Sequence, residues 1–310
     1  MKTFVVTGCN GYIGSHMCNE LGKLYNDCTI HGIDKHDKKH LRHLYDFYHH
    51  IDLAVDTFSL PEGTDAIFHF AAYISVEEGE QQPFKYFRNN LVGSIRLLER
   101  AIEQKIPYFI FSSTAAVYGN SKNPMFGHLF ENTPPNPFSV YGKTKAMFEE
   151  VLRNEKSINS AILRYFNVAG RDRKANLFEE HDPETHLIPL LVKDKTATIY
   201  GDDYPTKDGT CVRDFIDVRD VCRAHTLAYR YMEQNKENLL INIGSGKGYS
   251  VKEVAEKVNE IIHNGTMNIE YKERRDGDVP YLVADNSLAS NVLDFSPEYD
   301  LTQIIESMKE

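Results

Sequence analysis

The sequence predicts an α/β protein with a doubly wound parallel sheet, followed by a smaller C-terminal lobe. Short apolar runs alternate with helical patterns through the first half of the chain, which is typical of a parallel sheet covered by helices on both faces. The alternation begins at once, because residues 4–7 are a short apolar run that a glycine-containing loop and a helical pattern follow. The length of 310 residues favours one large domain or two coupled domains.

Composition and charge exclude several classes of partner. The formal net charge is −10, and no stripe of Lys and Arg offers the phosphate contacts of a nucleic-acid groove, so we expect no nucleic-acid partner. No apolar run reaches the ~20 residues that span a bilayer, and we expect no membrane partner. The first apolar run is also too short for a signal peptide. The five cysteines lack metal-ligand spacing, which indicates reduced thiols and a cytoplasmic location.

Three glycines, Gly8, Gly11 and Gly14, stand between the first strand and the first helix, and this context predicts a dinucleotide site on a Rossmann-type sheet. Gly8 allows a tight turn, Gly11 lets the backbone approach a pyrophosphate, and Gly14 permits close helix packing. The helix N-terminus favours phosphate. Asp34 ends the next strand, about 20 residues past the loop, where a carboxylate accepts hydrogen bonds from a ribose diol and repels a 2′-phosphate. The predicted cofactor is therefore NAD, not NADP.

Tyr141 and Lys145 are one helical turn apart and lie on one helix face. An ammonium group near a phenol favours the phenolate and lowers its pKa from the usual ~10, which makes a base usable at neutral pH. Thr114 follows the buried strand predicted at residues 108–113. Because ligands bind beyond the carboxyl ends of parallel strands, we expect its hydroxyl to assist this base.

The remaining segments are less regular. Residues 35–50 contain five histidines interleaved with basic residues, and we predict a solvated helix or loop and no metal site there; residues 51–53 predict a short strand. Beyond residue 167 we expect a short helix at 186–192, a strand at 212–218 that leads into a helix, and a strand at 240–243. The glycine-rich run 244–249 lacks the Gly-Lys-Ser/Thr ending of a phosphate loop and predicts a turn before a helix capped by Ser250.

With these motifs assembled, nearly the whole chain resembles the UDP-glucose 4-epimerase family of the extended short-chain dehydrogenase/reductase superfamily. The shared motifs are the Gly-x-x-Gly-x-x-Gly loop at 8–14, Ser-Ser-Thr-Ala-Ala-Val-Tyr-Gly at 112–119, Tyr-Gly-Lys-Thr-Lys at 141–145, Leu-Arg-Tyr-Phe-Asn at 163–167 and Arg-Arg-Asp-Gly-Asp at 274–278. Tyr-Gly-Asp-Asp-Tyr-Pro-Thr at 200–206 and Asp-Gly-Thr-Cys-Val-Arg-Asp at 208–214 are much more specific to the epimerases.

The resemblance implies a role for many residues. Tyr141 is the base, Lys145 orients it and holds the nicotinamide ribose, and Thr114 stands where the family has Ser or Thr. The implied cofactor contacts are Gly8, Gly11, Tyr12, Ile13, Gly14, Asp34, Lys35, Asp52, Leu53, Phe70, Ala71, Ala72, Asn89, Tyr141, Lys145 and Phe166. The implied UDP-sugar contacts are Thr114, Asn167, His186, Leu187, Thr198, Ile199, Tyr200, Arg213, Arg275 and Asp278.

The resemblance also implies an organisation. Residues 1–166 would form an NAD-binding domain to which 211–245 return, and residues 167–210 and 246–310 would form the lobe that binds the UDP-sugar. A homodimer would form through the long helices near 84–104 and 140–154. Two arginines suit a diphosphate, since guanidinium groups bind such oxyanions in bidentate fashion. The alternative for Arg213 and Arg275 is surface ion pairing with Asp214 and Asp276.

Several positions depart from the family pattern. Ile74 stands where many members have Lys, and the region 35–60 is shorter than usual, so contacts near the nicotinamide differ. His186 replaces a common Asn. Leu282 replaces a bulky Tyr that some members place beside the sugar, and a smaller residue there predicts room for an N-acetyl group.

The predicted activity is interconversion of UDP-galactose and UDP-glucose through a transient 4-keto sugar. A nucleotide-sugar 4,6-dehydratase is disfavoured, because its family carries an Asp-Glu pair after the Thr, whereas Ala115 and Ala116 stand here and cannot transfer a proton. A UDP-glucuronate 4-epimerase or another nucleotide-sugar-modifying enzyme stays open, since these differ mainly in what grips C6. A non-catalytic NAD-sensing scaffold is the alternative from another class.

Overall fold

The computed structural model describes residues 1–119, 127–181, 183–275 and 277–309. They belong to two compact units: unit 1 comprises Met1–Val117, Pro137–Arg164 and Cys222–Ile241, and unit 2 comprises Tyr118–Asn136, Tyr165–Val221 and Asn242–Glu310. The chain leaves unit 1 close to the boundary expected near residue 166. Residues 118–136 group with unit 2, and the returning segment is shorter than the expected 211–245. The assignment of cofactor to one unit and UDP-sugar to the other stays a prediction.

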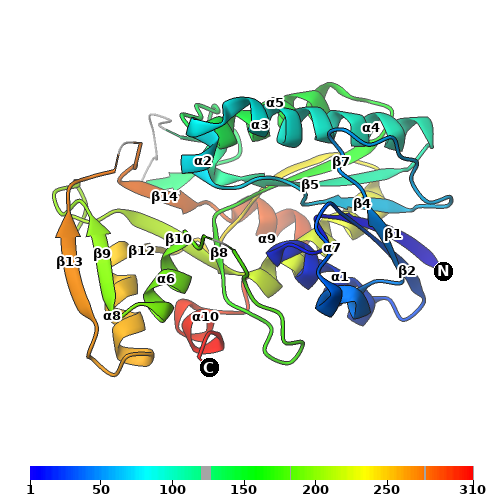
Figure 1. Cartoon of the computed structure of the whole chain (residues 1–310). Helices are drawn as coiled ribbons and strands as arrows, with labels where there is room; N and C mark the ends of the chain where they lie inside the picture. The colour runs from blue at the N-terminus through cyan, green and yellow to red at the C-terminus, as the bar shows by residue number, and fades with distance from the viewer. Residues whose placement is uncertain (120–126, 182, 276, 310) are drawn as a thin grey trace. The chain divides into compact units, whose positions relative to one another are not determined.

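Strands and helices alternate along the chain (Figure 1). The strands are β1 (Lys2–Thr7), β2 (Cys28–Asp34), β3 (Phe47–His50), β4 (Ala66–His69), β5 (Tyr108–Thr114), β6 (His128–Leu129), β7 (Asn159–Tyr165), β8 (Asn167–Ala169), β9 (Thr196–Tyr200), β10 (Val212–Asp217), β11 (Leu239–Ile243), β12 (Gly248–Ser250), β13 (Asn268–Lys272) and β14 (Tyr281–Ala284). The α-helices are α1 (Tyr12–Leu24), α2 (Val76–Gln81), α3 (Pro83–Tyr86), α4 (Gly93–Glu103), α5 (Val140–Asn154), α6 (Leu187–Lys193), α7 (Val218–Asn235), α8 (Val251–Ile261), α9 (Ser287–Leu293) and α10 (Leu301–Ser307). The 3-10 helices η1 (Lys39–Leu44) and η3 (Ala115–Val117) and the π-helix η2 (Phe87–Val92) complete the order.

Unit 1 is built on a sheet with the strand order β11-β7-β5-β4-β1-β2-β3, and β1 pairs in parallel with both β2 and β4. Helices α4 and α5 cover one face and α1 and α7 the other (Figure 1). Alternation along β1 serves both layers: Val5 packs in the core shared with Leu97 of α4 and Phe148 of α5, whereas the Phe4 ring lies 5.4 Å from that of Tyr229 on α7. The predicted doubly wound parallel sheet is confirmed.

The strand predicted at residues 51–53 is wrong, and the strand that closes this edge is β3. It pairs in parallel with β2, and His31 lies opposite Phe47. The His31 ring stacks on those of Phe47 and His49, with centroids 4.8 and 5.2 Å away. Polar residues can occupy an edge strand whose outer side is open, so the histidine-rich composition that predicted a helix or loop was misleading here.

The helical segment that begins at Pro83 is interrupted by the π-helix η2, which carries Asn89 and Asn90. Pi-turns inside helices are uncommon and frequently lie at functional sites. The Asn90 side chain accepts a 2.9 Å hydrogen bond from the Tyr73 N–H and donates one to the Tyr73 carbonyl. The π-turn therefore fixes the segment that follows β4.

Unit 2 contains a sheet with the order β12-β10-β14-β6, with β8 paired to β10, and a separate parallel pair β9-β13. Helices α6, α8 and α10 contribute to its apolar core. The expected helix cap at Ser250 is confirmed, since its hydroxyl accepts a 3.0 Å hydrogen bond from the Glu253 N–H and a full capping box is present. No helix within the described ranges is long and apolar enough to cross a membrane.

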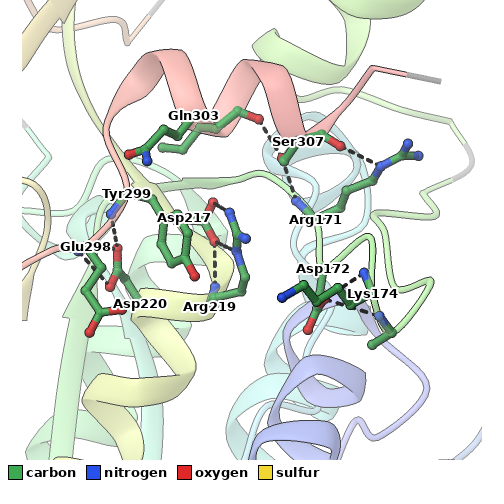
Figure 2. Close-up of polar contacts among 12 residues, drawn as sticks. Arg171, Asp172, Lys174, Asp217, Arg219, Asp220, Glu298, Tyr299, Gln303 and Ser307 are labelled. Atoms are coloured by element: carbon green, nitrogen blue, oxygen red, sulfur yellow. Dashed lines mark hydrogen bonds and ion pairs between the residues drawn. The ribbon is translucent and has the colours of Figure 1, made fainter.

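Charged side chains attach the C-terminal segment of unit 2 (Figure 2). Asp220 accepts hydrogen bonds from the N–H groups of Glu298 and Tyr299. Arg219 forms a two-point ion pair with the buried Asp217 and stacks on the Tyr299 ring at 3.5 Å. These contacts hold the residues before α10, together with the packing of Tyr299 against the apolar core of unit 2.

Candidate active site

The glycine loop of unit 1 lies at the point where the strand order reverses. The loop follows β1, and the segment after β4, next to β1 in the sheet, packs on it: a Cβ atom on Gly8 would lie 2.8 Å from the Ala71 N atom. Gly8 also has φ of +70°, which favours glycine. A Cβ atom on Gly14 would lie 2.0 Å from the Gly8 carbonyl O atom, so α1 approaches the loop as closely as predicted. Such a switch point is where α/β sheets bind dinucleotides.

The first turn of α1 provides the phosphate-binding geometry. Gly11 is the N-cap residue and has no side chain to occupy the helix end. Tyr12 and Ile13 form the first turn, and the Tyr12 ring packs edge-on against His16 with centroids 5.2 Å apart. The N–H groups of this turn and the helix dipole favour an anion. These residues fit the pyrophosphate of a dinucleotide.

Asp34 ends β2 beside this loop. Its carboxylate accepts hydrogen bonds from the N–H groups of Asn10 (3.0 Å) and His36 (2.9 Å). The loop thereby orients the carboxylate, and a carboxylate has further lone pairs for a ribose diol. This arrangement fits NAD and would repel a 2′-phosphate.

Three other predicted cofactor contacts gather around the Lys35 ammonium. It donates hydrogen bonds of 2.7 Å to Asn89 Oδ1 and to the Tyr73 hydroxyl, and it lies 4.0 Å from Asp52 Oδ2. The structure thus brings Lys35, Asp52 and Asn89 together. Leu53 is buried in the same unit, beside Asp52 in the chain.

The segment Phe70–Ala72 is held by β1. The Phe70 N–H donates to the Thr7 carbonyl at 3.1 Å and the Ala71 N–H to Thr7 Oγ1 at 3.3 Å. The Phe70 ring lies 4.9 Å from the His225 ring. The Ala71 backbone lies directly against Gly8 of the glycine loop.

The three predicted catalytic residues lie in unit 1. Thr114 ends β5, and Tyr141 and Lys145 lie on α5, which Ser139 caps through a 3.0 Å hydrogen bond from the Gly142 N–H. Gly142 permits close contact between α5 and η3, because a Cβ atom there would lie 2.7 Å from the Ala116 carbonyl O atom. The Thr114 hydroxyl hydrogen-bonds the Tyr141 phenol. The predicted proximity of Thr114 to the base is present.

Lys145 does not act on the Tyr141 pKa as the sequence predicted. Burial raises the pKa of Tyr141 to about 12, and the neighbour that lowers it is the Thr114 hydroxyl. The Lys145 ammonium donates a 2.7 Å hydrogen bond to the Ser112 carbonyl and lies 5.9 Å from the Tyr141 ring centroid. Burial also lowers the pKa of Lys145 to about 7, which weakens any field it exerts on the phenol.

A buried ion pair supports this helix and was not predicted. Glu149 lies one turn beyond Lys145 on α5, and its Oε2 atom is 2.6 Å from Nη2 of Arg164 on β7. Both side chains are at most 3% exposed, and the Ser113 hydroxyl also donates to Glu149. The signal in the sequence is the glutamate four residues after the lysine, on the same helix face.

Unit 2 holds most of the predicted UDP-sugar contacts. Arg213 on β10 donates to Asp278 Oδ1 at 3.1 Å and to the Val279 carbonyl at 2.7 Å. The Arg275 guanidinium stacks on the Tyr200 ring at 3.7 Å and, by hydrogen bonding, lowers the pKa of that tyrosine. Two pairs, Arg213 with Asp278 and Arg275 with Tyr200, are therefore brought together.

The alternative ion-pair partners of Arg213 and Arg275 are Asp214 and Asp276. Asp214 is buried and accepts hydrogen bonds from the N–H groups of Ser245 (2.7 Å), Gly246 (3.0 Å) and Ala284 (3.1 Å). Burial raises its pKa to about 6. Asp276 lies outside the described residues.

The remaining predicted contact residues differ in whether their side chains are exposed or buried. Thr198 and Tyr200 lie on one face of β9, whereas the Ile199 side chain points into the core and is 1% exposed, so only its main chain can meet a ligand. Phe166 is buried, and Asn167 begins β8 opposite Phe215 of β10. His186 is the N-cap residue of α6, and Leu187 is its first residue.

His186 lies among acidic groups. Its Nδ1 atom is 2.8 Å from Glu179 Oε1 and 3.1 Å from Glu184 Oε1. Burial alone would lower the pKa of His186, but the hydrogen bonds to the two glutamates outweigh it and raise the pKa to about 10. The sequence showed only that His186 replaces a common Asn, and its two neighbouring glutamates were not predicted.

Comparison with known proteins identifies the class. Residues 4–244 match the model of the NAD dependent epimerase/dehydratase family, and the chain belongs to this family. It is 39% identical over 319 residues to UDP-glucose 4-epimerase of Lactobacillus helveticus, with 97% of this chain and 93% of the relative covered. It superposes on UDP-glucose 4-epimerase of Brucella ovis in complex with NAD with a TM-score of 0.89, at 32% identity, covering 99% of this chain and 97% of the other. The UDP-Glc/GlcNAc 4-epimerase of Campylobacter jejuni is similar at a TM-score of 0.82 and 36% identity, covering 99% and 98%.

Proposed function

We propose that this chain is an NAD-dependent isomerase that interconverts UDP-galactose and UDP-glucose through a transient 4-keto sugar. Relatives that carry this activity in their names are similar over nearly the full length of the chain, and a similar structure was solved with NAD. NAD, bound at the glycine loop, would accept the hydride from C4 of the sugar and return it to C4, so it is retained through each cycle. The protein contributes position and proton transfer.

Tyr141 is the group that moves the proton. Its phenolate accepts the proton of the sugar 4-hydroxyl as C4 is oxidised and returns it when the keto group is reduced. The Thr114 hydroxyl, which lowers the pKa of Tyr141, stabilises the phenolate. Lys145 donates a hydrogen bond to the Ser112 carbonyl, which fixes α5 against β5. Its proposed role is to hold the nicotinamide ribose.

The observation that carries the proposal is the local arrangement after β5. Thr114 hydrogen-bonds Tyr141, and the next two residues, Ala115 and Ala116, have methyl side chains. A reversible oxidation at C4 needs one base, which is present. Elimination of water from C5 and C6 needs an additional acid and base, and neither alanine can serve.

The substrate range is the second part of the proposal. Arg213 and Arg275 bind the diphosphate, and Asp278 and Asn167 bind hydroxyl groups. A neighbour at 36% identity is named for both UDP-Glc and GlcNAc, and Leu282, on β14 opposite Arg213, leaves more room than a tyrosine would. We therefore extend the proposal to the N-acetylated pair; UDP-glucuronate is the remaining alternative.

Product analysis tests the range. The purified protein is incubated in parallel with UDP-galactose, UDP-N-acetylgalactosamine and UDP-glucuronate, and the sugars are separated. Formation of UDP-glucose and UDP-N-acetylglucosamine supports the proposal. Turnover of UDP-glucuronate alone would contradict it, and absence of UDP-N-acetylglucosamine would remove the N-acetyl extension.

Substitution of the base tests the mechanism. Tyr141→Phe keeps the ring and removes the hydroxyl, so we expect kcat to fall by about 10²–10⁴ while UDP affinity and NAD content stay unchanged. Phe148→Leu, on the same helix but in the core, is the control for general disturbance of α5. Near-normal activity of Tyr141→Phe would rule out its role as the base.

The proposal also includes a homodimeric state and a cytoplasmic location. A homodimer through the two long helical segments is supported by Phe84, Val92 and Met147, large apolar residues on α3, η2 and α5 that are 81%, 43% and 47% exposed. Light scattering should give a dimer for the wild type and a monomer for Phe84→Asp, with Leu24→Asp, an exposed residue at the end of α1, as the control. All five cysteines are free thiols, which suits the cytoplasm.

A further inference from the structure

Two glutamates and two histidines of unit 2 converge just before α6. Glu179, His181, Glu184 and His186 each offer one nitrogen or oxygen atom, and these four atoms lie within 4.8 Å of one another. The residues come from a single eight-residue stretch with the spacing Glu-x-His-x-x-Glu-x-His. This spacing is a metal-ligand pattern that lies outside the histidine-rich segment 35–50.

The distances in the cluster lie on both sides of those between ligands of a four-coordinate ion. Metal–nitrogen and metal–oxygen bonds of about 2.0–2.2 Å place the ligand atoms of a tetrahedral site about 3.3–3.6 Å apart. Glu179 Oε1 lies 2.9 Å from His181 Nδ1 and 2.8 Å from His186 Nδ1. Glu184 Oε2 lies 3.9 Å from His181 Nδ1. The four atoms lie within 4.8 Å of one another, so the most distant pair must move together by roughly 1 Å for a tetrahedral ion to bind.

One carboxylate of the cluster, that of Glu179, is buried, and one of its oxygen atoms lacks a hydrogen bond within the described part of the chain. The Glu179 side chain is 4% exposed, and that of Glu184 is 14% exposed. Among the residues that the structure describes, the Glu179 Oε2 atom has no hydrogen-bond partner. A buried carboxylate oxygen without a partner is costly, and a cation beside it would remove that cost.

The two oxygen atoms of the Glu184 carboxylate make different contacts. Its Oε1 atom accepts hydrogen bonds from the N–H groups of Thr185 (2.7 Å) and His186 (2.8 Å). These bonds fix the side chain and leave Oε2 directed at His181. A ligand that the backbone orients in this way needs little reordering when an ion binds.

We propose that Glu179, His181, Glu184 and His186 bind one divalent transition-metal ion, with Zn²⁺ as the representative. Imidazole nitrogen with carboxylate oxygen in a four-coordinate set suits Zn²⁺, whereas Mg²⁺ and Ca²⁺ prefer sites made wholly of oxygen. The two carboxylates balance the charge of the ion when both histidines are neutral. The ion ties Glu179 and His181 to Glu184 and His186 at the start of α6. The site shares His186 with the predicted UDP-sugar contacts. Neither Tyr141 nor the glycine loop takes part, so metal binding is measured separately from turnover.

Zinc titration of the whole protein tests the site. The protein is stripped with a chelator, and Zn²⁺ is titrated against a chromophoric chelator for the wild type and for His181→Gln, Glu184→Gln and His40→Gln. His40 is an exposed histidine of the 35–50 segment and serves as the matched control. We expect one tightly bound ion per chain, affinity reduced by at least about tenfold in His181→Gln and Glu184→Gln, and no change in His40→Gln.

Two outcomes would overturn the site. One is undiminished zinc affinity in both cluster variants; the other is loss of affinity in His40→Gln alone, which would assign the ion to the surface histidines. Should a cluster variant fail to fold, Co²⁺ loading of the wild type decides. Intense visible absorption, typical of four-coordinate Co²⁺ with nitrogen ligands, supports the site, and the weak spectrum of six-coordinate Co²⁺ overturns it.

Discussion

The Lys145 ammonium donates a 2.7 Å hydrogen bond to the Ser112 carbonyl and lies 5.9 Å from the centre of the Tyr141 ring. The lysine is thus anchored to the end of β5, the same strand end that carries Thr114. Thr114, in turn, hydrogen-bonds the phenol that we propose as the base. The carboxyl end of β5 therefore carries Thr114 and anchors Lys145.

Removal of the Thr114 hydroxyl should shift the pH dependence of the reaction. The phenolate is the active form. Burial raises the pKa of Tyr141 to about 12 even though the hydrogen bond from Thr114 lowers it. In Thr114→Val the pKa rises, so the ascending limb of kcat/KM moves to higher pH and activity at neutral pH falls. Thr114→Ser, which keeps the hydroxyl, should restore the limb. A pH–rate profile of Thr114→Val that overlays that of the wild type would contradict the role of this hydrogen bond.

Lys145 should make the protein less stable at neutral pH than at mildly alkaline pH. Its pKa is about 7 in the folded chain and near the usual 10.5 when unfolded, so between these values the unfolded state binds more protons. Stability then rises with pH across this window. In Lys145→Met this pH-dependent contribution disappears. The free energy of unfolding of the variant minus that of the wild type should therefore decrease as pH rises from 7 to about 9. Urea unfolding at several pH values measures it, and a difference that grows with pH would contradict it.

Gly14 should be essential for NAD retention. A methyl group at this position would lie 2.0 Å from the Gly8 carbonyl O atom, which forces α1 away from the loop. Gly14→Ala should therefore be purified with little or no NAD. Gly22→Ala is the matched control on the same helix, since the nearest atom there is 4.0 Å away. Chromatographic measurement of nucleotide per chain, with circular dichroism to verify folding, checks both. Full NAD content in Gly14→Ala would exclude the proposed cofactor loop.

The buried pair of Glu149 and Arg164 should be important for stability. Glu149→Gln leaves the guanidinium buried without its counter-charge, and removal of one partner of such a pair costs about 3–5 kcal/mol. Glu150→Gln removes the acid of an exposed pair with Arg153 on the same helix and should change little. Denaturant unfolding compares the two. The double variant Glu149→Met/Arg164→Met should be more stable than Glu149→Gln, and equal destabilisation by Glu149→Gln and Glu150→Gln would contradict the account.

The sequence predicted the parts of the fold that local patterns determine. The glycine spacing and the alternation of strand and helix were sufficient for the parallel sheet, and the Ser250 capping motif for α8. The edge strand β3 was missed because its pairing with β2 and the stacking of its rings on His31 are contacts with residues distant in sequence, which no local pattern encodes. The π-turn at Asn89 was missed for a similar reason, since the periodicity of an α-helix continues on both sides of it.

The site was predicted less completely than the fold. Spacing predicted that Tyr141 and Lys145 share a helix face, but the direction of the ammonium depends on the carbonyl at Ser112, which is distant in sequence. The pairs of Arg213 with Asp278 and Arg275 with Tyr200 likewise depend on long-range packing. Electrostatic effects of burial on Tyr141 cannot be read from a sequence, because they depend on what surrounds the ring.

The central claim, that hydride leaves and returns to C4, is tested most directly with UDP-galactose deuterated at that carbon. Wild-type protein with bound NAD should convert it more slowly than the unlabelled sugar, and the UDP-glucose formed should retain the deuterium at C4 with no loss to solvent. Conversion at the same rate with the label exchanged for solvent hydrogen would contradict the account, because it would mean that C4 is inverted by proton transfer alone.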